Sequence, residues 1–155
     1  MRDINLLVIH CSATKDGVPV SVDTIREWHQ ARGFEDIGYH WVIDVDGKVH
    51  RGRPESLPGA HAKGFNAHSI GVCLVGGATG HGRYTRAQWG ALRDLVDQLL
   101  ALYAIPHIVG HRDLSPDLDG DGVVEPHEWI KLCPSFDVAA WLAAGMVADP
   151  AHILE

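Results

Sequence analysis

INLLVIH, residues 4–10, is the stretch on which the fold prediction depends. Its residues are apolar and mostly branched, which is typical of a buried strand. Because side chains alternate along a strand, Leu6, Val8 and His10 are expected to share one face. The stretch therefore predicts a buried strand with a histidine at its C-terminal end.

Further strands and helices alternate along the rest of the chain. The predicted elements are a helix at 21–34, a hairpin at 40–53, a strand at 69–77, a helix at 85–103, a strand at 107–111 and a helix at 135–145. Gly33 marks the end of the first helix, and Asp46-Gly47 is a strong hairpin signal. Thr85 and Gln88 stand at capping-box spacing. Since hairpin and crossover connections are mixed, the fold class is α/β, with a central mixed β-sheet flanked by helices.

Composition limits the classes of function. The 155 residues fit a single domain, residues 1–155, without repeats or linkers. The formal net charge of −7 argues against a nucleic-acid partner, which would require clustered Lys and Arg. The apolar run after Arg2 and Asp3 is too short for a signal peptide or a membrane span, so we expect synthesis in the cytoplasm and no membrane insertion. Three cysteines without close pairing do not indicate a disulfide framework, and a monomer is the default expectation.

Three residues offer ligands for a metal ion. His10 ends one predicted strand, His111 ends another, and Cys133 stands before a proline and a predicted helix. Two imidazoles and a thiolate suit a catalytic zinc, since three protein ligands leave the fourth position to water. The spacing alone is weak evidence in a chain with 11 histidines. A second interpretation makes Cys133 a nucleophile paired with His111, as in a cysteine peptidase, and leaves His10 and Lys131 without a role.

Several motifs, in order along the chain, resemble those of the zinc-dependent N-acetylmuramoyl-L-alanine amidases, the family of phage lysozyme-type amidases and peptidoglycan recognition proteins. The motifs are HCSAT at 10–14, GYHWVI at 38–43, GAHAKGFNAHSIGVCLVGG at 59–77, GHRD at 110–113 and KLCPSFD at 131–137. The resemblance covers about residues 4–142 and implies a central mixed sheet with zinc at the base of a groove. It places the family's zinc ligands on His10, His111 and Cys133.

The same resemblance places other residues in the site. The tyrosine beside the metal falls on Tyr39, and the second catalytic group falls on Lys131. We assign Tyr39 to orienting or helping to deprotonate the attacking water and Lys131 to stabilising the oxyanion, with roles that can be partly exchanged. His61 and Asn66 resemble positions that line the groove for the muramyl peptide, so both are predicted substrate contacts.

The remaining histidines and cysteines receive structural interpretations. His40 alternates with Tyr39 and is expected to be packed or on the surface. Cys73 and Cys11 are expected to be small core residues. Solvent-exposed polar side chains are expected at the other histidines: His29, His50, His68, His81, His107, His127 and His152.

An acidic segment, DLDGDGVVEPHE at 117–128, matches the calcium-loop pattern D-x-[DN]-x-[DN]-G-x5-E. Its candidate calcium ligands are Asp117, Asp119, Asp121 and Glu128. Prolines before and inside the loop argue against a helix-loop-helix pair. Two interpretations stay open, a bound Ca²⁺ that rigidifies the connection to the third zinc ligand and a solvated acidic loop. In both, the segment at about 114–130 is an insertion between two zinc ligands.

The predicted function is that of a zinc-dependent peptidoglycan hydrolase that cleaves the amide between N-acetylmuramic acid and L-alanine. Peptidoglycan or muropeptides are the expected partners, and the expected role is that of a phage or prophage endolysin that reaches the wall through a membrane pore. The alternatives are a cytoplasmic amidase that recycles muropeptides, a non-catalytic recognition module whose relatives lose the metal-binding cysteine, and a calcium-dependent structural or regulatory protein.

Overall fold

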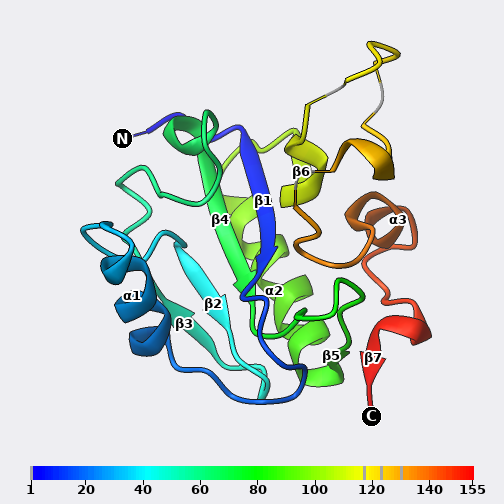
Figure 1. Cartoon of the computed structure of the whole chain (residues 1–155), viewed down its shortest axis with the longest axis horizontal. Helices are drawn as coiled ribbons and strands as arrows, with labels where there is room; N and C mark the ends of the chain where they lie inside the picture. Colours follow the sequence, from blue (N-terminus) through cyan, green and yellow to red (C-terminus); the bar gives the residue numbers. More distant parts are fainter. Residues whose placement is uncertain (1, 117, 123, 130) are drawn as a thin grey trace.

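Five strands form the central sheet of this computed structural model, which describes residues 2–116, 118–122, 124–129 and 131–155. The strands are β1 Leu6–Cys11, β2 Trp41–Ile43, β3 Val49–Arg51, β4 Ser69–Leu74 and β6 His107–Gly110. Their order across the sheet is β3-β2-β4-β1-β6. β1 runs parallel to β4 and β6, β2 runs parallel to β4, and β3 runs antiparallel to β2. The sheet is therefore mixed, and the predicted α/β class is confirmed (Figure 1).

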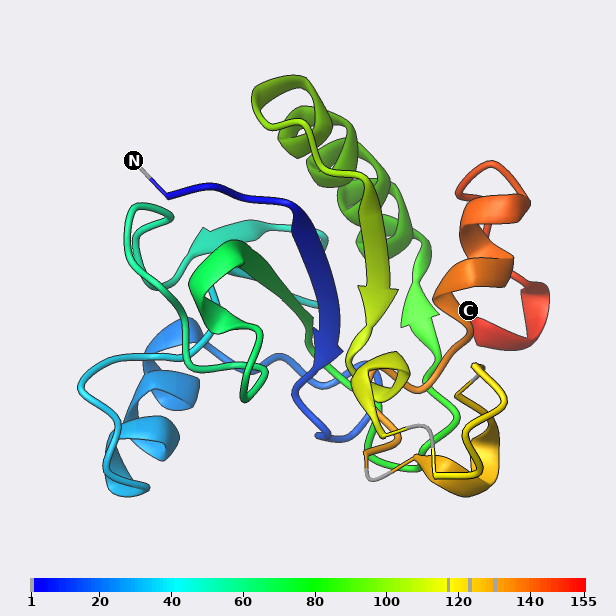
Figure 2. The same cartoon turned by 90° about the horizontal axis from the view of Figure 1, so that it is seen from above.

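Helices cover both faces of the sheet. They are α1 Val22–Ala31, α2 Arg86–Leu102 and α3 Val138–Ala143. Seen from above, α1 and α2 lie on opposite sides of the strands (Figure 2). Short 3₁₀ helices span Asn66–His68, His111–Leu114, Pro126–Glu128 and Pro150–His152. In the described part of the chain, no helix is both long and apolar enough to cross a membrane.

A second, two-stranded sheet is a feature that the sequence patterns did not predict. It pairs β5, Tyr84–Thr85, in parallel with β7, Ile153–Leu154. Each strand has only two residues, too few for a periodicity signal to be read. The pairing ties the C-terminal segment to the start of α2.

The two faces of β1 meet different surroundings. Leu7 and Ile9 belong to the larger core, which α2 closes with Leu92 and Val96. Side chains alternate along a strand, so Leu6, Val8 and His10 lie on the other face. On that side of the sheet a smaller core gathers Ile25 of α1, Ile37, Val42, Cys73 and Val75. Because His10 is the register partner of the buried Cys73, the histidine projects on the α1 side.

Local sequence signals set the ends of several elements. The Thr85 hydroxyl oxygen accepts the backbone N–H of Gln88, and the Gln88 side-chain oxygen accepts the backbone N–H of Thr85. The predicted capping box is therefore present. Gly47 has φ of 83° in the turn between β2 and β3, a conformation that favours glycine. The last helix is shorter than predicted because Asp137 caps it, so α3 begins at Val138.

The prediction that His29 is solvent-exposed is wrong. The residue is only 7% exposed, because its ring lies on the inner side of α1 against Tyr39 and Phe34. Its Nδ1 accepts the backbone N–H of Gly38 at 2.8 Å. Burial lowers the pKa of His29, which keeps the ring in the neutral form that can accept this bond.

The other structural interpretations hold with small differences. His40 is packed, at 1% exposure, and accepts the Gly71 N–H on Nδ1 at 3.0 Å. Cys73 and Cys11 are buried, as expected of core residues. His50 and His152 are half-buried. His68 is also half-buried, and the histidines that are exposed as predicted are His81, His107 and His127.

Candidate metal centre

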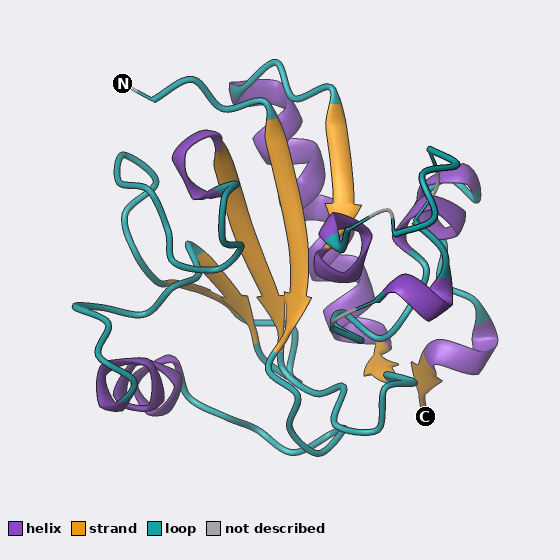
Figure 3. Cartoon of the chain, turned by 45° about the horizontal axis from the view of Figure 1, so that its top comes forward, coloured by secondary structure: helices purple, strands orange, loops and turns teal. Residues whose placement is uncertain are grey.

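Parallel strands bring the first two predicted ligands to one edge of the sheet. His10 lies near the end of β1, and His111 follows directly after β6, the parallel neighbour of β1. The arrowheads of the central strands point the same way, toward this edge (Figure 3). The potential ligand atoms of His10, His111 and Cys133 all lie within 4.8 Å of one another. The structure thus gathers the three residues that the sequence singled out.

Hydrogen bonds from three separate elements hold the Cys133 segment in place. The backbone N–H of Cys11 donates to Cys133 Sγ at 2.9 Å, so consecutive residues of β1 serve two of the three ligands. The backbone N–H of Arg112, next to His111, donates to the Cys133 carbonyl at 2.8 Å. The Tyr84 hydroxyl donates to the Pro134 carbonyl at 2.6 Å, after a cis peptide bond between Cys133 and Pro134.

The ionisation of the three side chains suits a divalent metal. Burial, together with the neighbouring histidines, holds the pKa of His10 well below its usual value. Burial and then the charge of Lys131 lower the pKa of His111 to about 4. Both rings are therefore neutral at neutral pH, the form that binds metal. Burial raises the pKa of the Cys133 thiol, and a cation in the site would lower it again.

This donor set fits zinc. Neutral imidazole and thiolate are its preferred ligands, whereas calcium and magnesium select oxygen. With three protein ligands, a tetrahedral ion keeps one position for water or substrate, which is the arrangement of a catalytic rather than a structural site.

Tyr39 and Lys131 lie at the same site. The Tyr39 ring centroid is 5.1 Å from that of His10. Burial raises the pKa of Tyr39 well above 10, so the phenol keeps its proton at neutral pH. Lys131 is exposed, and its charge acts on His111. Tyr39 thus offers a proton or a hydrogen bond, and Lys131 offers a positive charge.

The predicted substrate contacts have partners inside the protein. His61 is only 7% exposed, and its Nδ1 lies 2.8 Å from His10 Nε2. The Asn66 side-chain oxygen accepts the backbone N–H groups of His61 at 2.9 Å and Ala62 at 3.0 Å, which fixes this loop. Contact of His61 and Asn66 with substrate stays a prediction. The link between His61 and His10 is a contact that sequence reasoning missed, since 51 residues separate the two histidines.

The acidic segment folds around the carboxylate of Glu128. This side chain is 1% exposed and accepts backbone N–H groups from Leu118, from Asp119 at 3.2 Å and from Glu125 at 2.8 Å. Carboxylate oxygens of Asp119, Asp121, Glu125 and Glu128 lie within 4.8 Å of one another. Asp117, the first predicted calcium ligand, lies outside the described residues. Glu125 was not predicted, although it stands at position 9 of the loop pattern, which often contributes a ligand through water.

Calcium binding by this segment stays a prediction, with the solvated acidic loop as its alternative. If the ion binds, calcium at one hundred times its Kd is expected to raise the melting temperature by about 5–10 °C. Differential scanning calorimetry of zinc-loaded protein would measure this shift. The variant Asp119→Asn/Asp121→Asn should abolish it without changing zinc content. An unchanged melting temperature in the wild-type protein would leave only the solvated loop.

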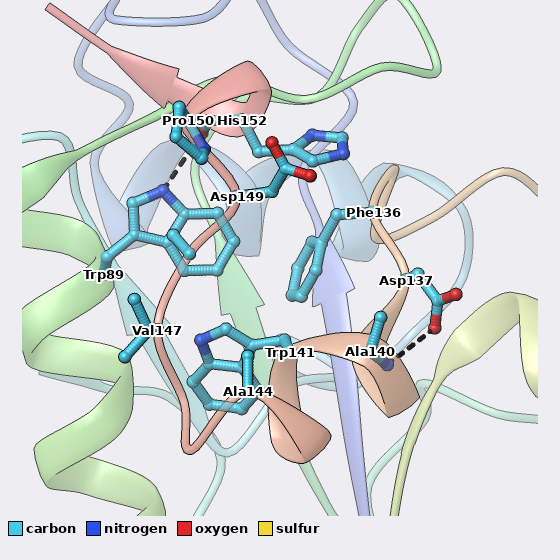
Figure 4. A pocket seen from close by; sticks show the side chains of 11 residues that line it. Trp89, Phe136, Asp137, Ala140, Trp141, Ala144, Val147, Asp149, Pro150 and His152 are labelled. Carbon is cyan, nitrogen blue, oxygen red and sulfur yellow. Dashed lines mark hydrogen bonds between the residues drawn. The ribbon is translucent and has the colours of Figure 1, made fainter.

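A separate cavity of about 330 Å³ lies between α2, α3 and the C-terminal segment (Figure 4). Its walls include Trp89, Phe136 and Trp141, which also pack into the main core. None of the predicted site residues that the structure describes lines this cavity. The cavity is therefore distinct from the metal centre.

Fold and site together define a class of protein, a mixed α/β domain with two histidines and a cysteine grouped as potential metal ligands at the carboxyl edge of its parallel strands. The profile of one family, described as N-acetylmuramoyl-L-alanine amidase, matches residues 1–128. The chain belongs to this family, and its enzyme class is that of a peptidoglycan amidase.

Individual relatives agree with the family. The endolysin of Enterobacteria phage T3 is 43% identical over 139 residues, which cover 87% of this chain and 83% of the endolysin. An uncharacterised protein of Haemophilus influenzae is 50% identical over 113 residues, 70% of this chain and 97% of that protein. Among solved structures, the N-acetylmuramoyl-L-alanine amidase LysC from Clostridium intestinale superposes with a TM-score of 0.75 at 28% identity, covering 94% of this chain and 86% of LysC.

Proposed function

We propose that this chain is a zinc-dependent hydrolase that cleaves the amide bond between N-acetylmuramic acid and L-alanine in peptidoglycan. The observation that carries the proposal is the grouping of His10, His111 and Cys133 in a chain of the amidase family. When bound by these residues, zinc would supply a Lewis acid for the amide carbonyl and lower the pKa of water to about 7.

The protein's own side chains have separate tasks in amide hydrolysis. Tyr39 holds a proton on its hydroxyl and donates a hydrogen bond that orients the attacking water or the departing amine. This assignment keeps the orienting role predicted from the sequence, while the raised pKa disfavours Tyr39 as a base. Lys131 places a positive charge where negative charge develops on the carbonyl oxygen.

The proposed biological role is that of a phage or prophage endolysin. Support comes from the 43% identity to the phage T3 endolysin over most of both chains. A cytoplasmic amidase that recycles soluble muropeptides would use the same chemistry. The non-catalytic recognition module is disfavoured because Cys133 is present and grouped with both histidines.

The test combines metal analysis with product analysis on the same sample. Mass spectrometry should find about one zinc per chain, since His10, His111 and Cys133 together hold one ion. Purified wall should release peptides with new amino-terminal L-alanine and no new reducing sugar ends. Chelation should stop this release, and added zinc should restore it. Cleavage that survives chelation but is lost with a thiol reagent would replace the zinc mechanism with a Cys133 nucleophile.

Substrate form separates the two biological roles. An endolysin should release peptide from intact cross-linked wall at a rate comparable to that from soluble muropeptide. A recycling amidase should act on the soluble muropeptide and leave intact wall almost unchanged.

A further inference from the structure

We propose that His61 is a positioning residue of the metal centre, which fixes the ring of His10 so that its Nδ1 faces His111 and Cys133. This inference rests on the proposed zinc-dependent function and gives His61 a role different from substrate contact. It follows from a hydrogen-bonded series of three buried polar residues, His10, His61 and Ser69, which are 1%, 7% and 0% exposed.

The contacts in this series couple the directions of its two hydrogen bonds, so that the direction of one sets that of the other. His10 Nε2 lies 2.8 Å from His61 Nδ1, and His61 Nε2 lies 3.1 Å from Ser69 Oγ. A neutral imidazole has one donor and one acceptor nitrogen. If His10 Nε2–H donates to His61 Nδ1, then His61 Nε2–H donates to the Ser69 hydroxyl. Each buried ring nitrogen of His61 then has a partner.

This arrangement determines which nitrogen of His10 is available to an ion. A histidine that binds metal through one ring nitrogen commonly donates its other N–H to a second protein group, which sets the tautomer and the ring orientation. Because Nε2 of His10 is engaged with His61, Nδ1 is the nitrogen left for the metal. A carboxylate or a carbonyl often fills the accepting role, and here an imidazole fills it.

The backbone around His61 is shaped to hold its ring. A Cβ atom on Gly71 of β4 would lie 2.6 Å from His61 Cγ, and one on Gly59 would lie 2.6 Å from His61 Cδ2. Both distances are too short for a real contact, so the ring packs directly against backbone at two glycines. Asn66 also fixes the backbone N–H of His61. With only 7% of His61 exposed, little of its ring surface is left for a substrate.

The test measures zinc affinity and the ligand field rather than activity alone. His61→Leu removes the acceptor at similar volume, whereas His61→Asn keeps an oxygen acceptor near the position of Nδ1. We expect His61→Leu to weaken zinc binding by about 10–100-fold, measured against a chromophoric chelator, and to shift the visible absorption bands of the cobalt-substituted protein. His61→Asn should stay close to wild type in both measurements.

Several outcomes separate this role from its alternatives. Unchanged zinc affinity and cobalt spectrum in His61→Leu, with a raised KM for muropeptide, would overturn the positioning role in favour of substrate contact. Should His61→Leu fail to fold, Ser69→Ala carries the test. It removes only the hydroxyl group at the far end of the hydrogen-bonded series and is expected to weaken zinc binding a few-fold. Wild-type affinity in Ser69→Ala would then count against the proposal. Absence of zinc from the wild-type protein would instead refute the proposed function itself.

Discussion

Replacing Cys133 by alanine is expected to remove zinc from the purified protein and to abolish measurable release of peptide from cell wall. A lost ligand should cost more than the 10–100-fold in metal affinity that is typical of groups outside the first coordination sphere. Without the ion, neither the carbonyl nor the attacking water is activated, so the rate should fall by at least about a thousand-fold. Metal content and the initial rate of peptide release measure the two effects.

Two matched variants test whether the loss of zinc and activity in Cys133→Ala comes from the loss of a zinc ligand. Cys73→Ala removes another buried cysteine, from β4, and should keep zinc, because Cys73 is not one of the grouped ligands. Cys133→Asp replaces the thiolate with a carboxylate, which is also a zinc ligand but cannot act as a thiol nucleophile. Retained zinc and partial activity in Cys133→Asp would support the ligand role. An active, zinc-free Cys133→Ala protein would refute it.

Replacing Lys131 by methionine is expected to leave zinc content unchanged and to lower kcat by about 100–1000-fold. The magnitude is that of removing one group that stabilises an oxyanion. Methionine keeps most of the side-chain length and removes the charge, so the comparison isolates electrostatics. Steady-state hydrolysis of a soluble muropeptide, with zinc measured on the same preparation, gives both numbers.

A second readout checks where the Lys131 charge acts. In zinc-free protein, the pKa of His111 is lowered to about 4 by burial and by Lys131. Removing a nearby positive charge stabilises the protonated ring, so NMR titration of Lys131→Met should show His111 with a higher pKa. Lys131→Arg keeps the charge and should leave that pKa almost unchanged. Zinc loss in Lys131→Met equal to that in Cys133→Ala would contradict the separation of binding and catalysis.

Local patterns were sufficient to predict most helices and strands. The apolar run at 4–10 became β1, the capping box became the start of α2, and Asp46-Gly47 became the turn between β2 and β3. These features depend on residues close together in the sequence. The grouping of His10, His111 and Cys133 came from the family resemblance, because spacing in the chain does not reveal which strand ends meet.

The features that escaped prediction depend on contacts between distant segments. The burial of His29 follows from the packing of α1 against Tyr39 and Phe34. The bond between His61 and His10 requires the 61–66 loop to lie over β4, where Gly71 leaves room for the ring. The Glu125 side chain was missed for another reason, since the loop pattern used for calcium leaves position 9 unspecified.

The position of β1 between β4 and β6 has a consequence for how an ion would enter and leave. A strand paired on both edges, as β1 is by β4 and β6, exchanges its amide hydrogens only when most of the molecule unfolds, whereas segments outside the ladder open locally. His10 is therefore expected to belong to the part of the fold that opens last. Cys133 lies outside the strands and is held by a few hydrogen bonds from Cys11 and Arg112. We therefore expect that an ion bound at this site exchanges by local opening on the Cys133 side, while the sheet remains intact.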